Sequence, residues 1–222
     1  PNCRDPCLAL GAAWLGAREE TQADILALAP CEKADGRLEL TILVTEAKYV
    51  SAGILATKRK ESVRQVRDTV KRIREALLGV GERLDREAWR SRLADLVLDG
   101  IQVPAASRVD LNAWRRAIRD GECDVRVRGY SHVFVPTAGD GASPTDVAPI
   151  VGVEGCEQEV YGRADLKKLL KAFASNEDPT PIRVAAGSSA GFDLPVDPIV
   201  VVPWLADPVK TETLSTGTIE MP

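Results

Sequence analysis

The sequence of 222 residues predicts an α/β or α+β fold, with a mixed central sheet flanked by helices. Two observations carry this prediction. Segments rich in β-branched residues occur before residue 50 and again after residue 124, as is typical of strands. Between them, apolar residues recur at intervals of three and four, which is typical of amphipathic helices. The length suits one large domain or a domain with an appendage.

Strands joined by a hairpin are predicted near the N-terminus. The small apolar residues at 7–16 suit a strand, and the segments at 24–29 and 38–45 suit two more. An Asp-Gly pair at 35–36 favours a tight turn between the last two. We therefore expect an antiparallel hairpin that ends at residues 46–49.

Three helices are predicted in the middle of the chain. The first begins near Lys60 and ends near Gly79, where its apolar periodicity stops. Asp85 is a candidate N-cap for the second helix, and Asp110 for the third. The third helix is expected to end at Gly121, because glycine readily adopts the left-handed conformation that follows many helices.

Shorter elements are predicted in the next part of the chain. A strand pair is expected over residues 124–136, followed by a Gly/Pro/Asp loop over 137–149. Residues 150–153 and 159–161 suit short strands, and 165–173 suit a last helix.

The composition changes at residue 176. Seven prolines fall between residues 179 and 222, which predicts a linker interrupted by an apolar run at 199–205. We therefore expect a domain over residues 1–175 and a Pro-rich linker or tail over 176–222. The single methionine, Met221, favours a piece excised from a longer protein.

Composition also limits the chemistry. A net charge of −4 excludes a uniformly basic surface, and a single histidine, His132, disfavours metal sites built on paired histidines. The five cysteines are expected to be reduced thiols. A phosphate-binding loop of the Gly-x4-Gly-Lys-Ser/Thr type does not occur in the sequence. The longest apolar runs fall short of a membrane span of about 18 residues, so we expect a cytoplasmic protein with no membrane partner.

Three charged residues mark the ends of the predicted hairpin. Asp24 opens its first strand, and Glu46 and Lys48 close its second strand. In an antiparallel hairpin the start of one strand lies beside the end of the other, so Asp24 and Glu46 are expected to converge. Glu46 and Lys48 are two residues apart and therefore point to the same face. The pattern predicts two carboxylates and one ammonium in one place.

This set of groups suits metal-assisted hydrolysis of a phosphodiester. Carboxylate oxygens bind Mg²⁺ or Mn²⁺, and the metal acidifies a water and neutralises phosphate charge. The ammonium of Lys48 positions that water or stabilises the transition state. The alternative is a strand end whose charges are solvated and carry no chemistry.

These residues resemble the motif of the PD-(D/E)XK nuclease superfamily. In both, an Asp precedes an apolar strand, a Glu-x-Lys closes a second strand, and a basic amphipathic helix follows. The resemblance implies a restriction-endonuclease-like core in which Asp24, Glu46 and Lys48 are catalytic. It also implies that the main-chain carbonyl of Ala47 is a further metal ligand and that Gln65 supports the site from the helix.

The match departs from the usual motif at one position. Ala23 stands before Asp24, where many members have proline. Asp35 is a rival for the acidic role, although it also suits the hairpin turn.

A concentration of positive charge follows the motif. Residues 58–75 hold eight basic and three acidic side chains, a net +5 that leaves −9 for the rest of the chain. Such a helix suits contacts with DNA phosphates, and we expect Arg64, Arg67 and Lys71 to make them. A helix whose charged face is merely solvated is the alternative.

A longer likeness extends beyond the nuclease motif. The segments at 46–51, 84–89, 129–135 and 158–161, together with the helix of Gln65, are similar to DptH/DndH-type translocase subunits of phosphorothioation-dependent restriction systems. This resemblance implies a nuclease domain in bacterial antiviral defence, with DNA and other subunits of a restriction complex as partners. It also implies a motor domain beyond residue 222.

The function expected from the sequence is therefore a metal-dependent DNA endonuclease that nicks or cleaves foreign DNA. One alternative is a catalytically inactive, nuclease-like module that binds DNA. Another is a subunit-docking domain that uses the helices of Trp89 and Trp114 and the apolar run at 199–205. The stretch from Tyr130 to Phe134 around His132 suits either a core strand or a surface for a partner or nucleotide.

Overall fold

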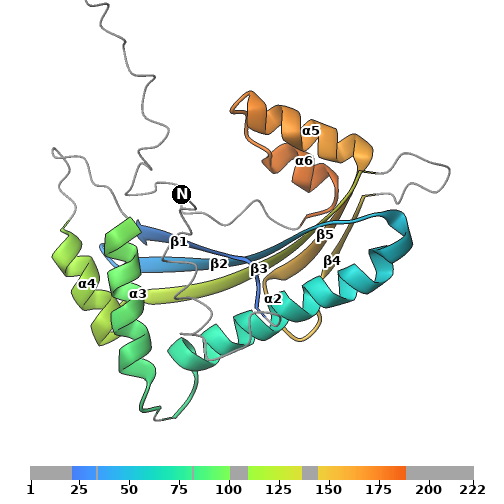
Figure 1. Ribbon diagram of the computed structural model, residues 1–222. Helices are drawn as coiled ribbons and strands as arrows, with labels where there is room; N and C mark the ends of the chain where they lie inside the picture. The colour runs from blue at the N-terminus through green and yellow to red at the C-terminus, as the bar shows by residue number, and fades with distance from the viewer. Residues whose placement is uncertain (1–21, 34, 82, 101–109, 137–144, 189–222) are drawn as a thin grey trace, which may run out of the picture.

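A five-stranded mixed sheet forms the centre of the computed structural model, which describes residues 22–33, 35–81, 83–100, 110–136 and 145–188. The strands lie in the order β1-β2-β3-β5-β4 (Figure 1). The two central pairs, β2–β3 and β3–β5, are parallel, and both outer pairs are antiparallel. The strands are β1 (Ile25–Glu32), β2 (Leu38–Tyr49), β3 (Asp124–Val135), β4 (Asp146–Pro149) and β5 (Cys156–Gly162).

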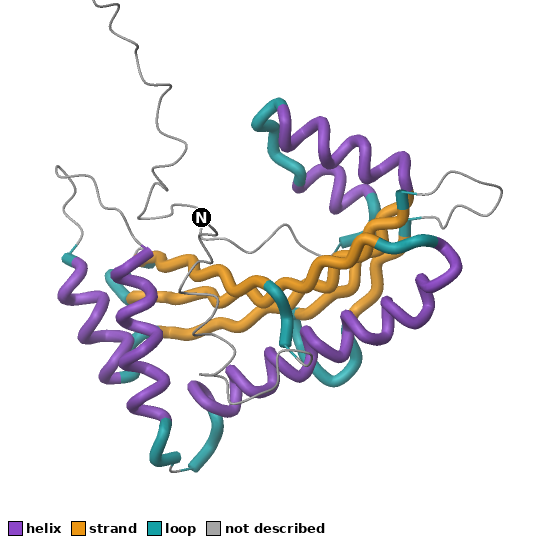
Figure 2. The backbone as a smooth tube through the Cα atoms, viewed as in Figure 1, coloured by secondary structure: helices purple, strands orange, loops and turns teal. Residues whose placement is uncertain are grey.

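Helices flank the sheet on both sides (Figure 2), which confirms the predicted fold class. The long helix α2 packs along β2 and β3 on one face, and α3 and α4 join the same hydrophobic core. On the other face α5 contacts β5 and β3, and α6 packs against α5. The helices are a short 3₁₀ helix η2 (Ala52–Ile54), α2 (Leu55–Leu78), α3 (Arg86–Gly100), α4 (Leu111–Asp120), α5 (Arg163–Ala174) and α6 (Thr180–Ala185).

The predicted hairpin is confirmed by the pairing of β1 with β2. Their antiparallel ladder runs from Glu32 opposite Leu38 to Ile25 opposite Thr45. The turn contains Gly36 with a φ of 79°, a conformation that glycine adopts at little cost. The ladder therefore ends immediately before the residues of the candidate motif.

Helix α2 lies unusually close to β3 at Gly129. A Cβ atom on Gly129 would lie 2.6 Å from Val66 Cγ1 and 2.9 Å from Val70 Cγ2. Both valines are fully buried. The missing side chain at residue 129 thus lets the helix pack directly on the strand.

The third predicted helix has the expected ends. The Asp110 side chain accepts hydrogen bonds from the backbone N–H groups of Asn112 and Ala113, and Gly121 adopts the left-handed conformation. Trp114 and Ile118 are buried between them, so the amphipathic pattern was a sound guide here.

Three predicted boundaries are wrong. The expected strand pair over 124–136 is one continuous strand, β3, because its valines at 125, 127, 133 and 135 alternate in a single phase and Gly129 serves close packing instead of a turn. The expected strand at 150–153 is a turn, because Gly152 and Gly155 both have positive φ; β4 instead occupies the end of the predicted loop. Helix α2 begins at Leu55, earlier than expected.

The described chain continues beyond α5 into α6 and ends at Ser188. The expected linker therefore begins with a short helix that packs against α5. The predicted first strand at 7–16 and the apolar run at 199–205 lie outside the described residues. Among the described helices, none combines the length and apolar character that crossing a membrane requires.

Candidate functional site

Glu46 lies near the end of β2, on the sheet face that α2 covers. It shares this face with Leu40, Ile42 and Val44, which belong to the main core. Its side chain has no solvent exposure. The backbone N–H of Asp24 donates a hydrogen bond to Glu46 Oε2 over 2.9 Å. A buried carboxylate thus follows three apolar residues on this face.

Lys48 follows two residues later on the same face and forms an ion pair with Glu46 Oε1. Its ammonium also lies 3.9 Å from Glu61 Oε1 on α2, and Glu61 is in turn paired with Lys58 over 2.7 Å. The Lys48 side chain is 20% exposed. The ammonium therefore lies at the boundary between the buried carboxylate and solvent.

Helix α2 fixes the segment before β1 from the other side of the site. Gln65 Nε2 donates to the backbone carbonyl of Gln22 over 3.1 Å, and Thr69 Oγ1 accepts from the backbone N–H of Ala23 over 3.1 Å. Gln65 thus holds the chain two residues before Asp24. This contact agrees with a supporting role for Gln65.

Asp24 and Asp35 lie at opposite ends of the hairpin. Ile25 and Thr45 form the last pair of the β1–β2 ladder. Asp24 precedes Ile25 and Glu46 follows Thr45, so Asp24 stands opposite Glu46. Asp35 lies at the turn, where its carboxylate accepts from Arg37 N and Arg37 Nε over 3.1 and 2.8 Å. The geometry favours Asp24 as the partner of Glu46.

Burial and neighbouring charges together set the electrostatics of the Glu46–Lys48 pair. Burial raises the pKa of Glu46, and the nearby charge of Asp24 raises it further, although the ion pair with Lys48 acts in the opposite direction. Burial alone would lower the pKa of Lys48, but Glu46, Asp24 and Glu61 outweigh it and raise that pKa. The site therefore has an excess of negative charge in a poorly solvated place.

A divalent cation fits this excess of negative charge. The carboxylates of Asp24 and Glu46 are hard oxygen donors, and an added positive charge would offset the cost of burying Glu46. Asp24 itself is exposed, so its carboxylate is accessible to an ion. The β1–β2 ladder ends two residues before Ala47, whose carbonyl is the third expected ligand. Within the described ranges no cluster of three or more His, Cys, Asp or Glu side chains is present.

The expected DNA contacts lie on the outer surface of α2. Arg64 and Lys71 are exposed, whereas Arg67 is half-buried and paired with Asp68 over 3.1 Å. Together with the exposed Lys60, these residues recur at intervals of four, three and four, so they form one stripe along the helix. We call Lys60, Arg64, Arg67 and Lys71 the basic stripe.

Not all of the positive charge in α2 faces solvent. Arg74 donates to the backbone carbonyls of Val127 and Glu154 over 2.7 and 2.8 Å. Arg59 donates to Gln158 Oε1 over 2.9 Å and to Asp146 Oδ2 over 2.7 Å. These two arginines therefore connect α2 to the sheet. A count of charges along the sequence includes them with the basic stripe, although their side chains are engaged in these contacts.

A buried polar row next to Glu46 was missed by the sequence analysis. Glu46, Ser131 and Gln158 are register partners on three adjacent strands, and all are buried. Ser131 Oγ shares a hydrogen bond of 2.7 Å with Ser62 on α2 and accepts one from Gln158 over 3.2 Å. The signal in the sequence was weak, because a lone Ser or Gln is common on any strand.

A second buried charge cluster lies on the opposite face of the sheet. Glu159 has no solvent exposure and pairs with Arg183 of α6 over 2.5 Å. It also accepts from Tyr161 OH over 2.6 Å and lies 3.2 Å from His132 Nδ1. The guanidinium of Arg183 lies 5.0 Å from the centre of the Tyr130 ring. This cluster ties α6 to the sheet, which suits a core role for His132.

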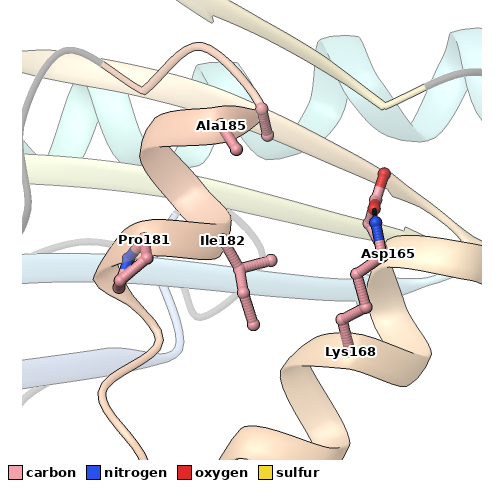
Figure 3. A pocket seen from close by; sticks show the side chains of 6 residues that line it. Asp165, Lys168, Pro181, Ile182 and Ala185 are labelled. Carbon is pink, nitrogen blue, oxygen red and sulfur yellow. Dashed lines mark hydrogen bonds and ion pairs between the residues drawn. The ribbon is translucent and has the colours of Figure 1, made fainter.

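A shallow pocket between α5 and α6 is a further concavity (Figure 3). Its charged residues, Asp165 and Lys168, pair with each other over 2.7 Å. We assign this pocket no function. The lining residues are Asp165, Lys168, Pro181, Ile182, Ala185 and Ala186.

Comparisons with known proteins identified no relative. Neither a protein-family model, nor a curated protein, nor a solved structure matches the chain. The functional argument therefore rests on the residues and their geometry.

Proposed function

We propose that this chain is a Mg²⁺-dependent endodeoxyribonuclease domain that nicks or cleaves DNA. The observation that carries the proposal is the buried carboxylate of Glu46, paired with Lys48 and hydrogen-bonded by the backbone of Asp24. Such a carboxylate is costly to bury, and its placement at a strand end beside a second acid suits a metal site.

In this proposal Asp24, Glu46 and the carbonyl of Ala47 hold Mg²⁺ or Mn²⁺. The metal, when bound, acidifies a water and offsets charge on the scissile phosphate. Lys48 lies within reach of Glu46 and near solvent, so its ammonium is placed to orient that water or to stabilise the transition state. Gln65 keeps the segment before Asp24 against α2 through the carbonyl of Gln22.

DNA is the proposed substrate because the basic stripe accompanies the site. Gln65 and Glu61 approach the site from the same helix whose outer surface carries Arg64 and Lys71. Lysine and arginine side chains contact phosphates without reading sequence. The helix thus links a candidate catalytic group to a surface that suits a polyanion.

The resemblance to the PD-(D/E)XK superfamily and to DptH/DndH-type translocases supplies the wider setting. We propose a restriction-endonuclease-like core that acts in the cytoplasm as part of a bacterial antiviral restriction complex. In that setting a motor domain and other subunits deliver the DNA.

Plasmid nicking in the presence of Mg²⁺ or Mn²⁺ tests the proposal. The wild-type chain, with its partner subunits where these are known, is expected to convert supercoiled plasmid to the open circle. Asp24→Ala and Lys48→Ala are each expected to lose this activity while retaining DNA binding. Equal nicking by wild type and both variants contradicts the catalytic proposal.

A nuclease-like module that binds DNA without cutting it is the second candidate. The observation that favours it is the ion pair itself, because Lys48 already supplies a positive charge to Glu46. This alternative predicts DNA binding that falls steeply with salt, needs no metal and is unchanged by Glu46→Ala.

A further inference from the structure

Tyr49 is a large aromatic side chain left open to solvent at the end of β2. It is 72% exposed and directly follows Lys48. Because side chains alternate along a strand, Tyr49 points to the face opposite Glu46 and Lys48. The same strand end therefore presents the candidate catalytic groups on one face and an exposed ring on the other.

Tyr49 does not lie alone on its face. Its register partner on β3 is Phe134, which is partly exposed. The Phe134 ring stacks on His132 with a centroid distance of 6.2 Å and on Tyr161 with a centroid distance of 6.0 Å. Ala47, the neighbour of Tyr49 on this face, is small and exposed, so it adds little bulk over the rings. We call Tyr49, His132 and Phe134 the aromatic platform.

The platform is held in place by the neighbouring strand β5. His132 Nδ1 lies 3.2 Å from the buried Glu159, and Tyr161 donates to the same carboxylate over 2.6 Å. The backbone N–H of Val50 donates to the carbonyl of Phe134 over 2.9 Å, which fixes the chain immediately after Tyr49. Rings that are already ordered lose little entropy when a flat ligand stacks on them.

Positive charge lies next to the exposed ring along the chain. Lys48 precedes Tyr49, with its side chain on the other face of the strand, and η2 and the N-terminus of α2 follow. The first turn of α2 holds no acidic residue, so the positive end of the helix dipole is not offset there. Lys60 is exposed one turn further on. Nearby cations and an open aromatic ring are the two features that proteins combine to bind single-stranded nucleic acid.

We propose that Tyr49 and the aromatic platform bind an unpaired nucleobase of the DNA, so that the preferred substrate is single-stranded or locally unpaired. This inference rests on the proposed function, because Tyr49 and Lys48 belong to the same strand end: DNA that passes around this end would meet the ring on one face and the ammonium on the other. A base is flat and apolar on its faces, which suits Tyr49 better than the deoxyribose or the phosphate does.

Anisotropy with a fluorescent oligothymidylate at low salt, in the presence of EDTA, tests the inference on the full 222-residue chain. Tyr49→Ala is expected to weaken binding by about 5-fold or more, because each stacked base contributes about 1–3 kcal/mol. Tyr49→Phe is expected to restore it, since the ring persists. Phe173→Ala is the matched control, because Phe173 is also exposed, at 85%, but lies on α5. Binding to relaxed closed-circular plasmid is expected to be unchanged in all three variants.

Photocrosslinking supplies a second measurement. An oligothymidylate that carries 5-iododeoxyuridine is expected to crosslink to Tyr49 or Phe134, as identified by mass spectrometry. Equal oligothymidylate affinity of wild type and Tyr49→Ala, or no binding at low salt, overturns the inference.

The two proposals fail separately. If Tyr49→Ala binds oligothymidylate normally while Glu46-dependent nicking persists, the stacking inference is wrong and the nuclease proposal stands. If stacking is confirmed while nicking is independent of Glu46, the nuclease proposal is wrong and the platform is a binding site for unpaired bases.

Discussion

Asp24 stands opposite Glu46 across the end of the β1–β2 ladder, and its backbone N–H donates to Glu46 Oε2 over 2.9 Å. The contact joins residues 22 positions apart in the sequence. It orients the Glu46 carboxylate with a main-chain donor, while the Asp24 side chain remains exposed. The two acids are thereby held together with different environments, one buried and one open to solvent.

Replacement of Glu46 is expected to separate stability from activity. Burial raises the pKa of Glu46, so the ionised carboxylate is less favourable in the folded state than in the unfolded chain. Glu46→Gln keeps the shape and the acceptor for Asp24, so thermal denaturation is expected to show a melting temperature equal to or above that of the wild type. Nicking with Mg²⁺ is expected to be lost.

Glu61→Gln is the matched control for Glu46→Gln. Its carboxylate also lies near Lys48, at 3.9 Å, but it is partly exposed and lies on α2. This variant is expected to retain most of the nicking activity. A large drop in melting temperature for Glu46→Gln, or full activity, would contradict the electrostatic argument.

The basic stripe is expected to set the salt dependence of DNA binding. Replacing Arg64, Arg67 and Lys71 together with alanine removes up to three phosphate contacts, which lowers the slope of log K against log salt by about 2–3. Arg67 should contribute least, because it is paired with Asp68. Filter binding across a salt series checks the slope. Arg119→Ala on the exposed end of α4 serves as the control. An unchanged slope in the triple variant would show that Arg64, Arg67 and Lys71 make no contact with DNA phosphates.

Gly129 is expected to tolerate no side chain. In Gly129→Ala the new Cβ would lie 2.6 Å from Val66 Cγ1, so α2 must shift away from β3. Overpacking of this kind costs about 1–3 kcal/mol of unfolding free energy, which urea denaturation measures. Gly53→Ala is the control, because a Cβ there meets nothing within 4 Å. Equal stability of the two variants would mean that the helix has more room than the structure shows.

Local patterns along the sequence predicted the hairpin and the helices well. The Asp-Gly pair at 35–36, the β-branched residues of β2 and the cap at Asp110 all act over a few residues, so their signals are visible without the fold. The convergence of Asp24 with Glu46 was also predictable, because an antiparallel hairpin has only one arrangement of its ends.

Contacts between distant segments could not be predicted in this way. Glu159 and Arg183 are 24 residues apart, and Arg183 lies in a segment whose prolines favoured a linker. The strand pair expected over 124–136 is one strand that contains Gly129, and the close approach of Val66 to this glycine depends on how α2 packs. In both cases the cause is tertiary packing, which leaves no periodic trace in the local sequence.

The buried pair of Glu159 and Arg183 is expected to be essential for stability. Arg183→Met leaves the Glu159 carboxylate buried with one cation fewer, which is expected to cost about 3–5 kcal/mol in chemical denaturation. Glu159→Gln combined with Arg183→Met should cost less than the sum of the two single changes, because each removes the same interaction. Arg163→Met on the exposed start of α5 is the control, and strict additivity would contradict a direct pairing.

The same cluster is expected to make the fold sensitive to acid. Burial alone would raise the pKa of Glu159, but hydrogen bonds from His132, Arg183 and Tyr161 outweigh it and hold that pKa well below its ordinary value of 4.5. The folded state therefore binds fewer protons than the unfolded state below about pH 4.5. The contribution of the ionised Glu159 to the free energy of unfolding is complete above that pH and is lost as the pH falls further. Urea denaturation of wild type and Glu159→Gln from neutral to acidic pH measures the effect. The wild type should lose stability more steeply below pH 4.5 than the variant, which lacks the titrating group. Parallel curves for the two proteins would show that Glu159 is not held ionised by its partners.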